Sequence, residues 1–381
     1  MKIVAAPDSF KGALRSPEVA AALADGWKSV RGNDEVVAIP LADGGEGTAE
    51  ALRIATGGEN VTVAAHDALM RPIRSEYSIL GDGETVVMEM ATAAGIELIN
   101  RDELDPLAAT SYGAGEVLLN ALKRGARKVV IGIGGSATVD GGAGFLQALG
   151  VKYFDADDKL IPAGIGGGDL HRIRRIDASA LAEVVKSALI VACDVTNPLL
   201  GEHGTVAVFG PQKGVTADLK PVMENNIRHW AEIVMRSGLA DCCNAHGDGA
   251  AGGLGFALRT VLKADICSGA GLVLDLSGFE DAVRGAALVI TGEGCSDEQT
   301  AYGKLCAVVA EHAEAAKVPT VLCSGALRGD TYLLEKRFSG VFSIAAGPGS
   351  LADAIAATHE NLRRAGANLA KLASAFSGNK G

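Results

Sequence analysis

The chain has 381 residues, of which 48% are hydrophobic and 21% are charged, and its formal net charge is −11. This length allows two domains of ordinary size with a substantial core. The acidic charge argues against nucleic acid and anionic membranes as partners, and an aromatic content of 4% argues against base-stacking platforms. The 50 glycines are nearly twice the usual share of about 7% and occur in short polar loops, which indicates sites of close backbone approach.

The seven cysteines form no CxxC pair, and most of them lie in apolar surroundings. This usage is typical of free thiols in a reducing cytoplasm and does not indicate a structural zinc site. The N-terminus has no signal-peptide layout, and no window approaches the length of a membrane span. We therefore expect a cytoplasmic protein.

The chain begins with an alternation of strands and helices. A strand predicted over 3–6 precedes a helix that begins near Ser16 and Pro17, where Ser as N-cap and Pro at the first helical position form a start signal. A second strand over 35–40 precedes a helix over 49–55. This order is typical of a parallel sheet that is covered by helices.

The middle of the chain has a different pattern. Strand-like runs follow one another over 61–65, 73–80 and 85–91, with a hairpin signal at Asp82 and Gly83. We therefore expect a mixed sheet in this part. The further elements predicted here are strands over 128–133 and 189–193 and helices over 113–123, 142–149, 221–236 and 255–262.

The first pattern returns near the end of the chain. Strands are predicted over 286–290, 319–323 and 340–344, and helices over 304–316 and 351–375. Together with the two strands at the start, these three strands predict a five-stranded doubly wound sheet.

These patterns predict an α/β protein with two domains. Residues 1–60 and 281–381 form the first domain, which is discontinuous and has the parallel sheet. Residues 61–280 form an inserted α/β domain with a mixed sheet.

The longest glycine-rich stretch, Ile131–Gly150, links a predicted buried strand to a helix. Its glycines would let backbone N–H groups approach an anion closely, and the helix N-terminus would add a partial positive charge. A tight strand-to-helix turn without a ligand would give the same pattern. Several similar loops, each with Asp, Glu, Ser or Thr, favour the anion-binding interpretation.

Polar side chains follow the predicted strands where the strands end, which is where open α/β sheets bind ligands. Carboxylates beside glycine-rich loops fit a magnesium–nucleotide site, because Mg²⁺ prefers one or two carboxylates with phosphate and water oxygens. A lysine such as Lys11 or Lys213 would meet developing phosphate charge. Each carboxylate alone has a simpler role as an N-cap or turn residue. The set comprises Asp8, Ser9, Lys11, Asp43, Glu46, Ser136, Asp140, Asp194, Glu293, Asp297 and Ser324.

Several well-known catalytic motifs are missing from the sequence. It contains no GxxxxGK[ST], HExxH or GxSxG run, and the glycines from Gly132 to Gly135 do not fit GxGxxG. This disfavours a P-loop protein, a Rossmann dehydrogenase, a zinc protease and a serine hydrolase.

Seven motifs, in order along nearly the whole chain, resemble those of one bacterial family. They are APDSFKG (6–12), ADGGEGT (42–48), GIGGSATVDGGAG (132–144), ACDVTNPLLG (192–201), FGPQKG (209–214), GAAGGLG (249–255) and ITGEG (290–294). The chain is thereby identified as similar to the bacterial glycerate kinases of the glyoxylate and sugar-acid pathways.

The resemblance implies ATP- and Mg²⁺-dependent phosphorylation of D-glycerate, with 2-phosphoglycerate as the expected product, as in glucarate and galactarate degradation. It also implies two α/β domains, one of them flavodoxin-like, with the site in the cleft between them. The alternatives are a kinase for another small hydroxy acid, a 3-phosphoglycerate product, a non-catalytic ligand-binding protein and a dehydrogenase. The oligomeric state is left open, with a homodimer as one option.

Loop position and residue type then suggest a role for each candidate residue. We expect Asp194 and Asp297 to bind the metal or accept the hydroxyl proton, and Lys11 to neutralise the transferred charge. The residues expected to bind the acceptor are Ser9, Asp43 and Arg71. Those expected to bind phosphate or nucleotide are Gly134, Gly135, Ser136 and Glu293.

Two positions depart from the family pattern. Cys295 follows TGEG where the family usually has Arg, and Val139 stands where GGSATNDGG has Asn. An Arg can pair bidentately with a carboxylate or phosphate, whereas Cys cannot. Another cation, such as Arg71 or Lys304, would then pair with the carboxylate or phosphate, or the protein would prefer a different acceptor. Alternatively, the usual Arg only stabilises the structure of the cleft and does not contact the ligand.

Overall fold

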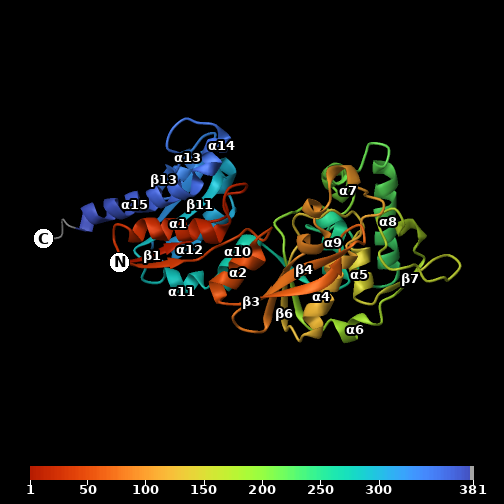
Figure 1. The fold of residues 1–381 in the computed structure, drawn as a ribbon. Helices are drawn as coiled ribbons and strands as arrows, with labels where there is room; N and C mark the ends of the chain where they lie inside the picture. The colour runs from red at the N-terminus through yellow and green to blue at the C-terminus, as the bar shows by residue number, and fades with distance from the viewer. Residues whose placement is uncertain (378–381) are drawn as a thin grey trace. The chain divides into compact units, whose positions relative to one another are not determined.

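Apolar runs from both ends of the chain form one sheet of five parallel strands (Figure 1). Its strands are β1 (Lys2–Ala5), β2 (Glu35–Ala38), β11 (Leu288–Ser296), β12 (Thr320–Leu327) and β13 (Gly340–Ser343). The order β13-β12-β11-β1-β2 is flavodoxin-like and confirms the predicted doubly wound sheet. The strand order reverses between β1 and β11, where this fold class binds ligands.

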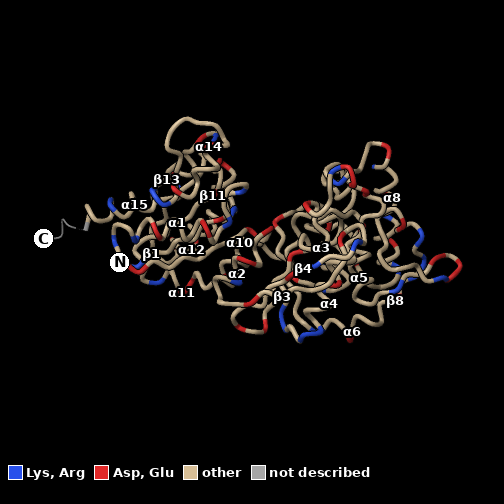
Figure 2. The backbone as a smooth tube through the Cα atoms, in the orientation of Figure 1, with Lys and Arg blue, Asp and Glu red and all other residues tan. Residues whose placement is uncertain are grey.

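The computed structural model of the chain describes residues 1–377 and divides into two units. Unit 1 comprises residues 1–43, 50–57 and the chain from Ala270 onward, and unit 2 comprises residues 44–49 and 58–269. Among residues 1–377, no helix combines the length and apolar character that a membrane span needs. Acidic and basic residues are interspersed along the backbone of each unit (Figure 2).

In unit 1, the longest helix packs against the first helix of the chain. Gly26 and Gly366 allow the close approach, because a Cβ at these positions would lie 2.0 Å from Arg363 O and 2.3 Å from Leu23 O. Trp27 is buried in the apolar core beneath these helices. The helices with residues in this unit are α1 (Ser16–Lys28), α2 (Thr48–Thr56), α10 (Gly269–Ser277), α11 (Phe279–Val283), α12 (Leu305–Ala315), α13 (Tyr332–Arg337), α14 (Leu351–Ala356) and α15 (Thr358–Ser377).

The single helix predicted over 351–375 is wrong, because the structure has two helices that meet at Ala357. The residues of α14 are all exposed, whereas α15 packs on α1. Thr358 Oγ1 donates to Ala354 O at 2.9 Å across the junction.

The middle of the chain forms a mixed sheet of six strands in unit 2, as predicted. Its strands are β3 (Glu59–His66), β4 (Pro72–Ile79), β5 (Thr85–Glu89), β6 (Lys128–Gly132), β9 (Ala188–Ala192) and β10 (Asp265–Cys267). The order is β10-β9-β6-β5-β4-β3. The four strands from β5 to β10 are parallel, whereas β4 is antiparallel to β3 and β5.

The remaining elements of unit 2 surround an apolar core that contains Phe145, Tyr153, Trp230 and Phe256. The helices are α3 (Ala91–Ala94), α4 (Tyr112–Lys123), α5 (Ala143–Ala148), α6 (Leu181–Val184), α7 (Thr205–Phe209), α8 (Lys220–Arg236) and α9 (Leu254–Thr260). A separate two-stranded sheet pairs β7 (Lys152–Phe154) with β8 (Arg175–Asp177).

Two strands of unit 1 continue beyond their predicted ends. β11 continues through Glu293 to Ser296, and β12 continues through Ser324 to Leu327. Glycines make this possible, because a Cβ at Gly292 would lie 2.0 Å from Cys323 O. The TGEG motif, predicted as a loop, is therefore part of a strand.

Candidate functional site

The loop after β1 places Asp8, Ser9 and Lys11 at the carboxyl end of the unit 1 sheet. The backbone N–H of Asp8 donates to Gly292 O of β11 at 2.8 Å. A Cβ at Gly294 would lie 3.4 Å from Phe10 Cα, so the loop lies directly against β11. These residues thus occupy the point where the strand order reverses, which is the ligand-binding position of the fold class.

Asp8 has a strongly perturbed carboxyl group. Burial raises the pKa of Asp8 to about 7, and the carboxylates of Asp43 and Glu293 add to the rise. The Ser9 N–H, which donates to Asp8 Oδ1 at 2.6 Å, and the Lys11 ammonium act in the opposite direction on this pKa. A carboxyl group with this pKa is suited to accept a proton near neutral pH.

Asp8 was not assigned a role from the sequence, because an Asp that precedes a helix is also a favoured cap. The signal that singles it out is its burial among other carboxylates, and this depends on the fold.

Lys11 and Asp43 form a loose ion pair at the same sheet end. Lys11 Nζ lies 3.9 Å from Asp43 Oδ2, and the two side chains are 82% and 45% exposed. An exposed pair of this kind contributes little to stability. Both groups therefore remain accessible to a ligand.

Glu293 is held by hydroxyl groups. Its Oε1 accepts hydrogen bonds from Ser296 Oγ at 2.8 Å and Thr300 Oγ1 at 2.6 Å. Ser296 Oγ in turn lies 2.5 Å from Ser324 Oγ, and all three hydroxyl residues are buried. This network fixes the carboxylate of Glu293 in the C-terminal half of β11.

Asp297 caps the 3-10 helix η6 (Glu298–Ala301), which is the simpler role that the sequence also allowed. Its Oδ1 accepts from the Gln299 N–H at 3.0 Å and lies 3.5 Å from Lys304 Nζ. The side chains of Asp297 and Lys304 are each about half exposed. Lys304 thus brings a cation next to Asp297, whereas Cys295 lies opposite Ala326 of β12.

In unit 2, the glycine-rich loop (residues 132–144) has two halves, residues 132–136 and 140–144. The second half is fixed by Asp140, which is fully buried. Its Oδ2 accepts from the N–H and the Oγ of Ser111, both at 2.7 Å, and from the Gly144 N–H at 3.2 Å. Its Oδ1 accepts from the Gly142 N–H at 3.2 Å. Burial raises the pKa of Asp140, and these donors act to lower it.

The expectation that the N-terminus of α5 faces a bound anion is therefore wrong. The N–H groups of Gly142 and Gly144, which would donate to that anion, donate to Asp140 instead. The glycines here serve packing, because a Cβ at Gly141 would lie 2.4 Å from Trp230 Cδ1 and one at Gly144 would lie 2.0 Å from Thr110 Oγ1.

Within the first half of the loop, Gly134 has the most open surroundings. Gly134 and Gly135 are exposed, and a Cβ at Gly134 would meet only Gly45 Cα, at 3.5 Å. The N–H groups of Gly134 and Gly135 donate to no acceptor in the described part of the chain. Ser136 Oγ accepts from Lys213 Nζ at 2.5 Å. An anion-binding role therefore falls to this half.

Two carboxylates lie at the ends of the neighbouring strands. Glu89 ends β5 and accepts from the N–H groups of Gly47 at 3.2 Å and Ala49 at 2.8 Å, and burial raises its pKa to about 6. Asp194 follows β9, is exposed and accepts from the Gly269 N–H at 3.1 Å. The carboxyl ends of β5, β6 and β9 thus bring these carboxylates to the same sheet edge as the first half of the loop.

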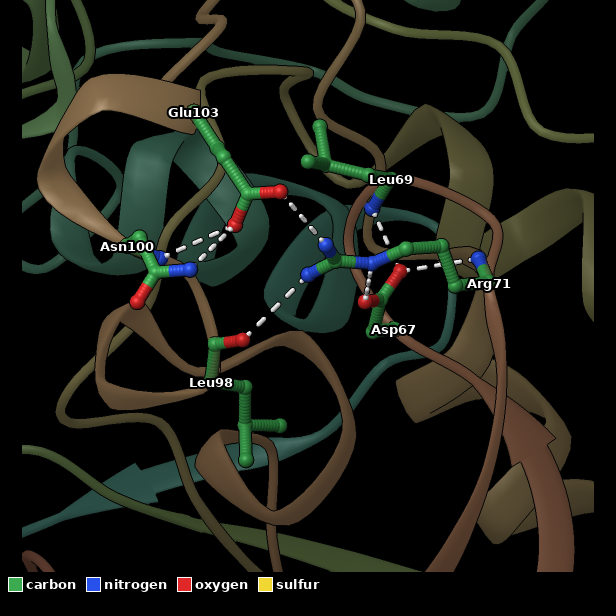
Figure 3. A network of polar contacts seen from close by, with 6 residues as sticks. All are labelled: Asp67, Leu69, Arg71, Leu98, Asn100 and Glu103. Carbon is green, nitrogen blue, oxygen red and sulfur yellow. Dashed lines mark hydrogen bonds and ion pairs between the residues drawn. The ribbon is translucent and has the colours of Figure 1, made fainter.

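Arg71 lies in the β3–β4 turn and is held in a network of polar contacts (Figure 3). Its Nε donates to Asp67 Oδ2 at 2.5 Å, Nη1 to Glu103 Oε1 at 3.0 Å and Nη2 to Leu98 O at 3.3 Å. Three of its five N–H groups are thus used inside unit 2. Binding of the acceptor substrate by Arg71 stays a prediction. Such a substrate would bind the remaining N–H groups of Arg71 or would displace Glu103.

Val139, one of the two departures from the family pattern, is fully buried in the apolar core of unit 2. An apolar side chain suits this position, so the departure there concerns packing.

Comparisons with known proteins agree with the sequence motifs. The model of the glycerate kinase family matches residues 3–374. The chain is 41% identical over 372 residues to the glycerate 2-kinase of Escherichia coli (strain K12) and 42% identical over 372 residues to the glycerate kinase of Bacillus subtilis (strain 168). Each of these alignments covers 97% of both chains.

Among solved structures, a crystal structure described as a glycerate kinase 2 from Salmonella typhimurium LT2 matches with a TM-score of 0.89 and 38% sequence identity. The match covers 99% of each chain. The motifs, the fold and the similarity over the full length agree: the chain belongs to the glycerate kinase family, a family of kinases.

Proposed function

We propose that the protein transfers the terminal phosphoryl group of ATP to the 2-hydroxyl of D-glycerate, giving 2-phosphoglycerate and ADP. The observation that carries this proposal is the similarity over 97% of the chain to proteins named glycerate kinases, one of them a glycerate 2-kinase. Phosphoryl transfer depends mainly on positioning and electrostatic stabilisation. The residues of each unit are therefore assigned roles of these two kinds.

In unit 2, the first half of the glycine-rich loop binds the phosphates of ATP. Three consecutive residues supply donors: Gly134 and Gly135, whose N–H groups have no acceptor in the part of the chain that the structure describes, and Ser136 with its hydroxyl. Consecutive backbone N–H groups form a concave site that suits an anion.

In unit 1, Ser9 and Asp43 hold the acceptor, Lys11 offsets transferred charge and Glu293 contributes to nucleotide binding. The raised pKa of Asp8 supports this residue as the group that accepts the proton of the acceptor hydroxyl. Among the carboxylates at this sheet end, Asp8 thus takes the role for which the sequence suggested Asp297.

The carboxylates present fit Mg²⁺, which prefers oxygen ligands and takes only one or two carboxylates from the protein. Asp194 or Asp297 would hold the ion; the Oδ1 of each accepts from a backbone N–H, and Asp194 Oδ2 has no hydrogen-bond partner among residues 1–377. Residues 1–377 contain no group of three or more His, Cys, Asp or Glu side chains that could hold a metal ion. Bound Mg²⁺ supplies positive charge that neutralises the phosphate oxygens.

The first test is an assay of ATP consumption by the purified protein with Mg²⁺ and D-glycerate. We expect turnover, and a product that enolase accepts directly, because 2-phosphoglycerate is the substrate of that enzyme. A product that needs a mutase before enolase would show transfer to the 3-hydroxyl. Turnover only with another hydroxy acid would contradict the proposed acceptor.

Asp8→Asn tests the proposed base. We expect kcat to fall about 100-fold or more, because a positioned base contributes about 10²–10⁴-fold. In the wild-type protein, kcat should decrease as the pH falls below about 7, where Asp8 becomes protonated. Asp25→Asn, at an exposed position of α1, is the matched control. A kcat for Asp8→Asn close to that of this control would assign the base to another group.

A further inference from the structure

Lys213 is a buried lysine that has no ionised partner at hydrogen-bond distance among the described residues. It ends the 3-10 helix η4 (Pro211–Lys213), and it is 2% exposed. Its Nζ donates to Ser136 Oγ at 2.5 Å and to Thr138 O at 2.9 Å, and both acceptors belong to the glycine-rich loop. Within residues 1–377, no ion pair joins this ammonium to a carboxylate.

The charged groups around Lys213 do not compensate its burial. Asp140 is the carboxylate that favours the charged form of Lys213, but its two oxygens accept four hydrogen bonds from other donors. α7, which packs against η4, has no ionisable side chain, and Asp105, near Gly214, is exposed and caps its own turn. Burial consequently lowers the pKa of Lys213 to about 7.

A buried ammonium that lacks a paired anion is unfavourable, and proteins usually pair such charges. The residues next to this charge also have unused donors. Ser136 Oγ accepts from Lys213, and its own hydrogen has no acceptor among the described residues. The N–H groups of Gly134 and Gly135 are unpartnered as well. One anion bound at this loop would satisfy the hydroxyl, the two N–H groups and the buried charge together.

We infer that Lys213 and Ser136 form one anion-binding pair, in which the buried ammonium orients the Ser136 hydroxyl so that its O–H donates to a phosphate oxygen at the glycine-rich loop. The ligand class is the phosphate chain of a nucleoside di- or triphosphate. The inference rests on the proposed function, in which this loop binds the phosphates of ATP. Lys213 acts through Ser136 and is a positioning residue.

The pair has a consequence for proton binding. A bound anion stabilises the charged form of Lys213 and raises its pKa. Nucleotide binding at about pH 8 should therefore be accompanied by proton uptake, because part of the Lys213 population is neutral in the free protein.

The test compares Ser136→Ala, Lys213→Met and the double variant with the wild-type protein. Lys220→Met, the same substitution at an exposed position at the start of α8, is the matched control. The readouts are KM for ATP, KM for D-glycerate, kcat, and the Kd of ADP from calorimetry. Calorimetry in two buffers of different ionisation enthalpy also gives the number of protons taken up.

We expect each single variant to raise KM for ATP and the Kd of ADP about tenfold and to leave KM for D-glycerate unchanged. The double variant should be no worse than either single variant, because the two residues act as one unit. Lys220→Met should behave like the wild type. Proton uptake on ADP binding should disappear in Lys213→Met and decrease in Ser136→Ala.

Three outcomes would overturn the inference. The first is a Lys213→Met variant that is less stable than the wild type but binds ADP with the same affinity. Lys213 would then have only a structural role. The second is additive effects in the double variant. The third outcome applies if Lys213→Met does not fold, because Ser136→Ala then decides the test. In that case, a Ser136→Ala variant with the ADP affinity and proton uptake of the wild type would overturn the inference. Absence of turnover with D-glycerate in the wild type would refute the proposed function instead, and ADP binding would still decide the inference.

Discussion

Residues 132–136 and 140–144 of the glycine-rich loop look alike in sequence, yet the central glycines of the first half and the glycines of the second have opposite surroundings. Gly134 and Gly135 are exposed, and their N–H groups have no acceptor among the described residues. Gly142 and Gly144 are buried and donate to Asp140. One half of the loop therefore has donors available for a ligand, whereas the other uses its donors to hold the start of α5.

This difference shows that a glycine can be required for two physical reasons. In the second half, the space for a side chain is occupied by Trp230 or Thr110. At Gly134, in the first half, the space is open and the backbone itself is the functional group. Substitutions in the second half should thus lower stability, and a substitution at Gly134 in the first half should lower nucleotide affinity.

The largest effect is expected for Gly144→Ala. The new Cβ would lie 2.0 Å from Thr110 Oγ1 and 2.9 Å from Asp140 Oδ2, so it would disturb both the packing and the Asp140 hydrogen bonds. Overpacking costs about 1–3 kcal/mol and occasionally more, and lost buried hydrogen bonds add to this. We expect the free energy of unfolding in urea to fall by about 4 kcal/mol.

The matched control is Gly271→Ala, also in a helix, where a Cβ would have no atom within 4 Å. Here Ala should raise stability slightly, because Gly is a poor helix former. A Gly144→Ala variant as stable as this control would mean that the second half can relax, and the contrast between the halves would fail.

The next largest effect is expected for Asp140→Asn. An amide would place its NH₂ group against N–H or O–H donors from Ser111, Gly142 or Gly144. Losing acceptors from a buried site of this kind costs about 2–4 kcal/mol. Thermal and urea unfolding would measure the loss.

Asp82→Asn is the control for that variant, because Asp82 accepts similar bonds from Glu84 and Thr85 but is exposed at a turn. We expect it to cost about 1 kcal/mol or less. Equal losses at positions 140 and 82 would show that burial does not set the role of Asp140.

The sequence predicted both sheets, because buried parallel strands and βα alternation are local patterns in the chain. It did not predict the extension of β11 through Glu293, because TGEG has the composition of a loop and the strand continues only where Cys323 O approaches Gly292.

The candidate site was predictable by position and only partly by role. Loop positions at strand ends follow from the fold class, and Ser136 lies in such a loop after β6, whereas Glu293 lies within the extended β11. The raised pKa of Asp8 depends on burial and on carboxylates such as Glu293, and the Lys213 ammonium is buried against Ser136 and Thr138. These groups are far away in sequence, and no local pattern contains them.

Gly134→Ala tests the first half of the loop. A Cβ there would meet only Gly45 Cα, at 3.5 Å, so stability should change by no more than about 0.5 kcal/mol. The methyl group would keep a phosphate away from the exposed N–H groups. We expect KM for ATP to rise about tenfold, with KM for D-glycerate unchanged. If KM for ATP is unaffected, the phosphates do not bind at this loop.

The smallest effect is expected for Thr138→Val, at the border between the two halves. Thr138 Oγ1 is buried and has no hydrogen-bond partner in the described part of the chain, so replacing the hydroxyl by a methyl group removes an unfavourable polar burial. We expect stability to rise by about 1 kcal/mol and KM for ATP to stay at the wild-type value, because the bond from Lys213 goes to the backbone carbonyl of Thr138. Thr205→Val, at a second buried and unpartnered hydroxyl in α7, should give a similar gain. A higher KM for ATP in Thr138→Val alone would extend the ligand-binding half of the loop to residue 138 and identify the partner that this hydroxyl lacks.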